Sequence, residues 1–169
     1  MTGNSIILCG FMGCGKSTVG KTLARLLDRE FIDMDTYIEQ QAGMTVSQIF
    51  ESQGEAAFRA MEREACRELS QRKNCVVASG GGALTFDENV RVFHEAQCPV
   101  VLLDVPLSAI LQRLQNDTTR PLLQRPDKEQ AAQQLYDKRL PIYRSAATLT
   151  VSGTDSAQLA RQIAEAVGA

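Results

Sequence analysis

Short apolar runs alternate with longer segments of helical periodicity along this chain of 169 residues. Five runs rich in Val, Ile and Leu show little polar alternation, which is typical of strands buried on both faces. They cover residues 5–9, 30–33, 75–78, 100–104 and 148–151. The remaining pattern predicts helices over residues 16–27, 35–41, 46–52, 55–71, 87–96, 107–115, 128–146 and 156–167. This order predicts an α/β domain with a parallel sheet and right-handed crossovers, in which ligands gather outside the carboxyl ends of the strands.

Local signals mark several ends of these helices. Residues 45–48, 52–55 and 85–88 each fit the capping-box pattern of a helix start, and Gly43 can end the helix before it. Residues 116–126 carry two prolines and several polar residues, which predicts a mobile loop.

Composition and charge narrow the class of protein. A chain of 169 residues with 44% hydrophobic residues suits one compact domain, residues 1–169. The net charge of −2 gives no general attraction to nucleic acid or to an anionic membrane. The five cysteines include no Cys-x-x-Cys pair, which favours a reducing cytoplasm, and residues 1–4 do not begin a signal peptide. We interpret Cys9, Cys75 and Cys98 as small core residues.

The strongest chemical signal is the segment Gly-Phe-Met-Gly-Cys-Gly-Lys-Ser at residues 10–17. It follows a predicted strand and precedes a predicted helix, which is the context of a phosphate-binding P-loop. The glycines allow backbone N–H groups to surround a polyphosphate at the positive end of the helix. Lys16 can reach the β- and γ-phosphates, and Ser17 can bind Mg²⁺. Cys14 lies in this loop, where a helix N-terminus lowers the pKa of a thiol.

Two carboxylates, Asp33 and Asp35, follow the second predicted strand. At i and i+2 on extended backbone they share a face. One can hold Mg²⁺, directly or through water, and the other can orient or deprotonate a hydroxyl group. Asp104 ends another apolar strand and is an alternative metal ligand, but we prefer Asp33 because it belongs to a pair.

Three glycines and several arginines complete the candidate site. Gly80, Gly81 and Gly82 follow the third predicted strand, where their backbone can approach a ligand closely. Arg59 and Glu62 are spaced i, i+3 on one helix and can face the same way. Arg120, in the irregular loop, can fold over a transferring phosphoryl group.

These pieces occur in one order: the P-loop at 10–20, Phe-Ile-Asp-Met-Asp at 31–35, Gly-Glu-Ala-Ala-Phe-Arg-Ala-Met-Glu at 54–62, Gly-Gly-Gly at 80–82, Arg-Pro-Leu-Leu at 120–123 and Arg-Leu-Pro-Ile-Tyr at 139–143. In this order the chain resembles the shikimate kinase family over nearly its whole length. The resemblance implies a three-layer α/β/α P-loop kinase with a five-stranded parallel sheet in the order 2-3-1-4-5. It also implies a substrate-binding helical region at about 34–62 and a lid at about 112–125.

The resemblance implies ATP-dependent phosphorylation of the 3-hydroxyl of shikimate, giving shikimate 3-phosphate and ADP on the route to chorismate and the aromatic amino acids. It implies Mg²⁺ as cofactor and a cytoplasmic monomer with no nucleic-acid or membrane partner. Nucleotide binding is expected at Gly13, Cys14, Gly15, Lys16, Ser17, Thr18, Arg113 and Arg120. Shikimate binding is expected at Asp35, Arg59, Gly81 and Arg139, metal binding at Ser17 and Asp33, and catalysis at Lys16, Asp35 and Arg120.

The residues agree chemically with that substrate. Two arginines suit its carboxylate through forked hydrogen bonds, and Asp35 suits its hydroxyl groups. Cys14 and Ser79 replace the more usual Ala and Thr of the family, and neither change removes a needed group.

Three alternative functions remain for this chain. A gluconate kinase-like enzyme explains the P-loop but not the joint Phe-Arg-x-x-Glu and Gly-Gly-Gly spacing. A GTP-dependent switch needs a guanine-reading tetrapeptide such as Asn-Lys-x-Asp, which the sequence lacks. An inactive relative would have lost Lys16, Asp35 or an arginine, and all are present.

Overall fold

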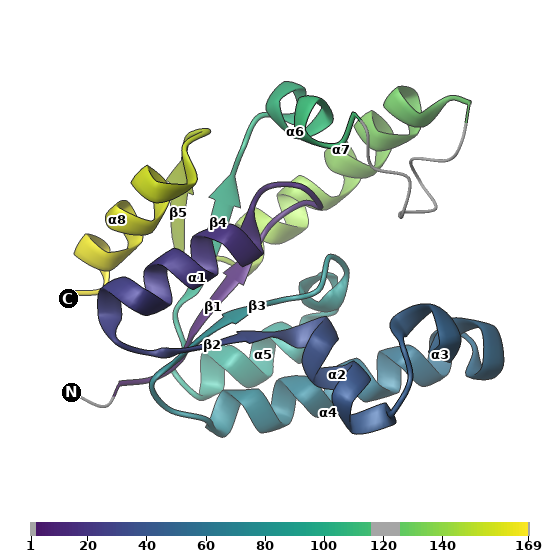
Figure 1. Cartoon of the computed structure of the whole chain (residues 1–169), viewed down its shortest axis with the longest axis horizontal. Coiled ribbons are helices and arrows are strands. Elements are labelled where there is room, and N and C mark those ends of the chain that lie inside the picture. The colour runs from purple at the N-terminus through teal and green to yellow at the C-terminus, as the bar shows by residue number, and fades with distance from the viewer. Residues whose placement is uncertain (1–2, 116–125, 169) are drawn as a thin grey trace.

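The computed structural model describes residues 3–115 and 126–168. Its centre is a five-stranded sheet in the order β2-β3-β1-β4-β5, and every strand pair is parallel (Figure 1). The strands are β1 (Ile6–Cys9), β2 (Glu30–Asp33), β3 (Cys75–Ala78), β4 (Val100–Asp104) and β5 (Leu149–Ser152). The predicted parallel sheet and its order are therefore confirmed. Only β1 and β5 differ from the predicted bounds: β1 begins one residue later, and β5 both begins and ends one residue later.

Eight α-helices surround the sheet in the described residues: α1 (Lys16–Leu27), α2 (Met34–Ala42), α3 (Val46–Gln53), α4 (Glu55–Gln71), α5 (Asp87–Glu95), α6 (Leu107–Arg113), α7 (Lys128–Ala146) and α8 (Ser156–Ala166). Helices α1 and α8 pack against each other on one face, and α4, α5 and α7 lie on the other (Figure 1). All eight predicted helices are confirmed within two residues at each end. The short 3₁₀ helix η1 (Ala83–Thr85) was not predicted.

The core is built by the strands themselves. Every residue of β1 and β3 is buried, as are the first four residues of β4. This burial explains the continuous apolar runs in the sequence, because a central parallel strand is covered by helices on both faces. Cys9, Cys75 and Cys98 are buried in this core, as predicted.

The capping signals around α3 are confirmed. Thr45 Oγ1 accepts a hydrogen bond from the Gln48 amide at 3.1 Å, and Gln48 Oε1 accepts one from the Thr45 amide at 2.8 Å. Gly43 ends α2 with a φ of 67°, a left-handed conformation that glycine adopts without steric cost.

The other two predicted capping boxes are wrong. Helix α4 begins after Gly54 and α5 begins after Phe86, and neither N-terminus has a side-chain cap. Ser52 still belongs to α3 and donates to the Gln48 carbonyl at 2.7 Å, while Thr85 closes η1 by donating to the Gly82 carbonyl at 2.6 Å. The preceding helices have already used these hydroxyl groups, which local pattern cannot reveal.

Within residues 3–115 and 126–168, no helix combines the length and the apolar character needed to cross a lipid bilayer.

Gly20 allows α1 to approach the sheet closely. A Cβ atom at this buried position would lie 2.5 Å from Cε1 of Phe31 and 3.4 Å from Cδ1 of Leu8. This contact places the start of α1, and with it the P-loop, directly against β1 and β2.

We therefore expect Gly20→Ala to destabilise the protein by about 1–3 kcal/mol, because the added methyl overpacks the contact with Phe31. At an exposed position of a helix, a Gly→Ala change would instead raise the free energy of unfolding. Urea denaturation measures the free energy of unfolding, with Arg25→Ala on the exposed face of α1 as the control, expected to change it by less than about 0.5 kcal/mol. An increase in stability for Gly20→Ala would contradict the close packing.

Candidate active site

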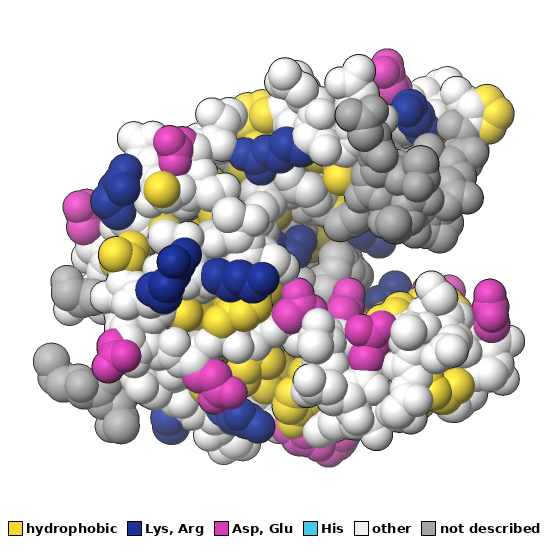
Figure 2. Space-filling view, in the orientation of Figure 1, with side chains coloured by type: hydrophobic (Ala, Val, Ile, Leu, Met, Phe, Trp, Pro, Cys, Tyr) yellow, Lys and Arg dark blue, Asp and Glu magenta, His cyan; other side chains and the backbone are white. Residues whose placement is uncertain are grey.

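A cleft of about 600 Å³ opens at the carboxyl end of the sheet. Figure 2 shows the molecule hollowed here, on the side where α2 and α3 project in Figure 1. Four segments line the cleft: the P-loop, the end of β2 with the start of α2, the start of α3, and the glycine segment after β3. Among the described residues, this cleft contains most of the predicted site residues.

The P-loop connects β1 to α1 with the geometry that its glycines permit. Gly13 and Gly15 have φ values of 77° and 98°, which a residue with a side chain rarely adopts. Lys16 Nζ donates to the Gly10 carbonyl at 2.6 Å and to the Phe11 carbonyl at 3.4 Å. The ammonium group is thus held at the loop, beside the N-terminus of α1, where an anion is favoured.

Ser17 and Asp33 lie together at one side of the cleft. Ser17 Oγ donates to Asp33 Oδ2 at 3.1 Å, and the other carboxylate oxygen of Asp33 accepts from the Thr36 amide at 3.1 Å. Asp33 therefore caps α2 and presents one oxygen beside the Ser17 hydroxyl. Two adjacent oxygen groups are the kind of ligand that Mg²⁺ prefers.

Asp35 lies in the first turn of α2. The expectation that Asp33 and Asp35 share extended backbone is wrong, because the strand ends at Asp33 and the chain turns directly into the helix. Both side chains nevertheless line the cleft. Burial, followed by the negative charge of Asp33, raises the pKa of the Asp35 carboxyl group above its ordinary value. A raised pKa makes the carboxylate a better proton acceptor.

The glycine segment after β3 forms a bare backbone ledge beside the cleft. A Cβ atom on Gly80 would lie 2.8 Å from Asp35 Oδ1, and one on Gly82 would lie 2.8 Å from Arg59 Nη1. Neither glycine has a positive φ, so space and not backbone conformation requires glycine here. The two side chains rest against the main chain where any larger residue would displace them.

Arg59 forms the ion pair that its spacing predicts. Its Nη1 lies 2.8 Å from Glu62 Oε1, and the Glu62 side chain is only 1% exposed. Burial raises the pKa of the Glu62 carboxyl group, and the Arg59 guanidinium acts in the opposite direction. The i, i+3 spacing alone also allowed a solvent-exposed ion pair, and the burial of Glu62 excludes it.

Arg139 reaches the same ledge from α7. Its Nη1 donates to the Gly81 carbonyl at 3.3 Å, and the Tyr143 hydroxyl donates to the same carbonyl. Tyr143 is buried, and burial raises its pKa to about 12, so its hydroxyl remains a donor at neutral pH. The Gly81 carbonyl is therefore fixed by two donors from one helix.

Arg113, at the end of α6, joins the P-loop to the segment after β5. Its Nη1 donates to the Gly13 carbonyl at 3.1 Å and its Nη2 to the Thr154 carbonyl at 2.6 Å. Thr18 lines the cleft with the rest of the loop. Arg120 and most of the predicted lid, 116–125, lie outside the described residues, as does nearly all of the predicted mobile loop.

Cys14 does not face the cleft. Its side chain is buried, and its Sγ would lie 2.7 Å from a Cβ atom on Gly10, beneath the loop. Its amide donates to the Phe11 carbonyl at 3.1 Å, which closes a turn of the loop. Burial therefore limits chemical labelling of this thiol.

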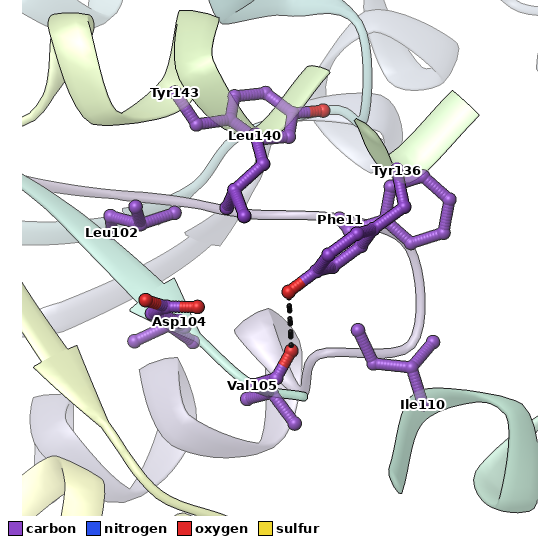
Figure 3. Close-up of a pocket in the computed structure, with 9 residues that line it drawn as sticks. Phe11, Leu102, Asp104, Val105, Ile110, Tyr136, Leu140 and Tyr143 are labelled. Atoms are coloured by element: carbon purple, nitrogen blue, oxygen red, sulfur yellow. Dashed lines mark hydrogen bonds between the residues drawn. The ribbon is translucent and has the colours of Figure 1, made fainter. Parts of the chain in front are cut away.

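Asp104 belongs to a different part of the molecule. It lies beside a cavity of about 10 Å³, roughly one water molecule, between β4 and α7 (Figure 3). One of its oxygens lies 3.5 Å from Arg144 Nη2. Asp104 is absent from the lining of the P-loop cleft, which favours Asp33 as the metal ligand.

Sequence reasoning missed one contributor to the site, Tyr143, which holds the Gly81 carbonyl. It included Gly80 and Gly82, but not their role of providing space for the Asp35 and Arg59 side chains. The run of three glycines was visible, but which side chains press on them depends on contacts across the fold.

The structure predicts different roles for two tyrosines of α7. Tyr143→Phe removes a buried donor to the Gly81 carbonyl, so we expect a loss of about 1–2 kcal/mol in the free energy of unfolding. Tyr136 is the matched control, because its half-buried hydroxyl donates to the Val105 carbonyl at 3.3 Å (Figure 3). Tyr136→Phe should lower the free energy of unfolding by about 0.5 kcal/mol or less, since water can replace the Tyr136 hydroxyl as donor to the Val105 carbonyl. Equal losses in chemical denaturation would contradict this difference.

Comparison with known proteins identifies relatives of this chain. The family model for shikimate kinase matches residues 12–168. A shikimate kinase from Halorhodospira halophila is 46% identical over 168 residues, which cover 98% of this chain and 94% of the relative.

Solved structures agree with the sequence comparison. A shikimate kinase from Acinetobacter baumannii in complex with shikimate superposes with a TM-score of 0.89 at 41% identity, covering 98% of this chain and 93% of that one. A gluconokinase from Sinorhizobium meliloti reaches a TM-score of only 0.55 at 18% identity, with 97% and 95% of the chains covered, and shares the fold alone. By its sequence, its strand order and its P-loop cleft, this chain belongs to the shikimate kinase family.

Proposed function

We propose that this protein transfers the γ-phosphoryl group of ATP to the 3-hydroxyl of shikimate, giving shikimate 3-phosphate and ADP. One observation carries the proposal: a single cleft combines a P-loop with a half-buried carboxylate, Asp35, and is bordered by a glycine ledge that Arg59 and Arg139 contact. The relative from Acinetobacter baumannii binds shikimate, which supports this acceptor.

The acceptor side of the cleft suits a small hydroxylated carboxylate. Arg59 and Arg139 both contact the glycine ledge, so their positive charges converge near Gly81 and Gly82. Two guanidinium groups can hold a carboxylate through forked hydrogen bonds. Asp35, against Gly80, can accept hydrogen bonds from hydroxyl groups of the same molecule. The Gly81 amide is proposed as a further donor.

The donor side is the P-loop. Backbone groups from Gly13 to Thr18 would surround the phosphates of ATP, and Lys16 would move from its loop carbonyls to the β- and γ-phosphates. Arg113, against the Gly13 carbonyl, is proposed to border the nucleotide. We keep Arg120, within the proposed lid of residues 112–125, as the arginine that stabilises the charge of the transferring group.

The Ser17 hydroxyl and the Asp33 carboxylate fit a bound Mg²⁺, because two oxygen groups already meet at 3.1 Å beside the loop. Bound there with ATP, Mg²⁺ would neutralise phosphate charge. Asp33 can bind the Mg²⁺ directly or through a water molecule.

Asp35 would orient the 3-hydroxyl toward the phosphoryl group and accept its proton as the bond forms. Its raised pKa supports the second role, and its place against Gly80 supports the first. In either role the rate depends mainly on positioning the two substrates.

We further propose that the chain acts as a cytoplasmic monomer on small molecules alone, with residues 34–62 as its substrate-binding region. All five cysteines are free and buried, which fits a reducing compartment.

The proposed activity predicts shikimate-dependent release of ADP. In a coupled assay with shikimate, gluconate or no acceptor, we expect shikimate to raise the rate at least about a hundredfold over the other two, since positioned hydroxyl attack outpaces hydrolysis. Excess EDTA should abolish the rate. Equal ADP release without shikimate would refute the proposal. A higher rate with gluconate than with shikimate would favour a gluconate kinase-like enzyme.

Asp35→Asn should lower kcat by about 10²–10⁴-fold while ATP still binds, because the amide cannot accept the proton. The control is Asp104→Asn, a carboxylate outside the cleft that pairs with Arg144, for which kcat should stay within about twofold. Steady-state kinetics and nucleotide binding measure both. Near-normal turnover of Asp35→Asn would remove its proposed role.

A further inference from the structure

The guanidinium group of Arg59 is enclosed by groups from two separate segments of the fold. From its own helix, Glu62 binds Nη1 at 2.8 Å, and the ring centroid of Phe58 lies 5.5 Å from Cζ. From the segment around η1, Gly82 before this helix leaves room for the two Nη atoms, and the ring centroid of Phe86 after it lies 5.2 Å from Cζ. Phe86 is thus the closer of the two rings.

The hydrogen bonds of Arg59 within the protein do not fix its orientation. Its buried Nε has no hydrogen-bond partner among the described residues, and the nearest carboxylate oxygen, Oε1 of Glu55, lies 3.6 Å away. The one short contact, at Nη1, and the long ion pair at Nε define the plane of the guanidinium only in part. A guanidinium that lies over an aromatic face gains electrostatic attraction and loses the remaining freedom of orientation.

Phe86 is placed firmly, although the residue is 37% exposed. Its carbonyl accepts bonds from the amides of Asn89 and Val90 at 3.1 and 3.3 Å. The buried Asn89 side chain donates to the Ala83 carbonyl at 2.9 Å, which ties η1 to α5. The turn that carries Phe86 is therefore fixed from inside, while the ring itself contributes little to the core.

We propose that Phe86 is a positioning residue for recognition of the substrate carboxylate. Its ring holds the Arg59 guanidinium over the glycine ledge, so that the remaining N–H donors face the cleft. The inference rests on the proposed function, because it takes Arg59 to bind the carboxylate of shikimate. It assigns a part in specificity to an exposed aromatic residue that does not line the cleft.

The test compares Phe86→Leu, which keeps an apolar side chain, with Phe86→Tyr, which keeps the aromatic face. For Phe86→Leu we expect the KM for shikimate to rise about threefold to tenfold, with kcat and the KM for ATP within about twofold of the wild-type values. Phe86→Tyr should restore the KM for shikimate to within about twofold. Leu26→Ala is the control, because Leu26 is an apolar residue of α1 that is 52% exposed and does not line the cleft.

A second substrate separates positioning from a general structural effect. In the analogue of shikimate with a CH₂OH group in place of the carboxylate, Arg59 has no anion to bind. The preference in kcat/KM for shikimate over this analogue should shrink about threefold to tenfold in Phe86→Leu and stay unchanged in Leu26→Ala. An unchanged KM and preference in Phe86→Leu, with an active wild type, would overturn this inference alone. Equal losses for both substrates, or no rescue by Tyr, would also overturn it. A wild type inactive with shikimate would refute the proposed function and this inference with it.

Discussion

The arrangement of the site depends on the absence of side chains from one short stretch of backbone. Gly80 and Gly82 leave the main chain bare. The Asp35 carboxylate lies 2.8 Å from the position that a Cβ atom on Gly80 would take, and the Arg59 guanidinium lies 2.8 Å from that of a Cβ atom on Gly82. Because Asp35 from α2 and Arg59 from α4 both approach this ledge closely, their charged groups converge on one small volume. Arg139 and Tyr143 complete the ledge by fixing the Gly81 carbonyl from a third helix. A single methyl group at either outer glycine would displace a charged group.

The strand order brings this ledge next to the P-loop. Strands β1 and β3 are neighbours, with Leu8 paired to Ala78, so the loop after β1 and the glycines after β3 leave the sheet side by side. Strand β2 lies on the other side of β3 and delivers Asp33 and Asp35 to the same edge. A parallel sheet thereby places phosphate donor and hydroxyl acceptor in one cleft, although their residues are far apart in the sequence. The close packing of Gly20 against Phe31 keeps α1 in register with this edge.

The fold was largely predictable because strong local patterns set it. Buried strands read as continuous apolar runs, and seven of the eight helices start at the predicted residue, α2 one residue earlier. The capping boxes show where local reading fails: Thr45 caps α3 as predicted, whereas Ser52 and Thr85 are occupied within preceding helices. The pair Asp33 and Asp35 was recognised as functional, but its extended conformation was wrong, since Asp33 caps a helix that begins at once. The structure also places two ambiguous residues, since Cys14 is buried and Asp104 lies beside another cavity.

By itself, the sequence determined the P-loop, the layered α/β architecture and the residue types that could recognise a phosphate, a metal and a carboxylate. These features depend on spacing and periodicity within short segments, which one chain displays directly. Only the tertiary structure decided that Glu62 of the Arg59–Glu62 pair is buried, that Tyr143 holds Gly81, and that Phe86 lies over the Arg59 guanidinium. The contacts of Tyr143 and Phe86 join residues from separate elements, and the burial of Glu62 depends on what packs against its helix. No local pattern encodes a distance of a few ångströms between such segments, because packing of the whole core sets it.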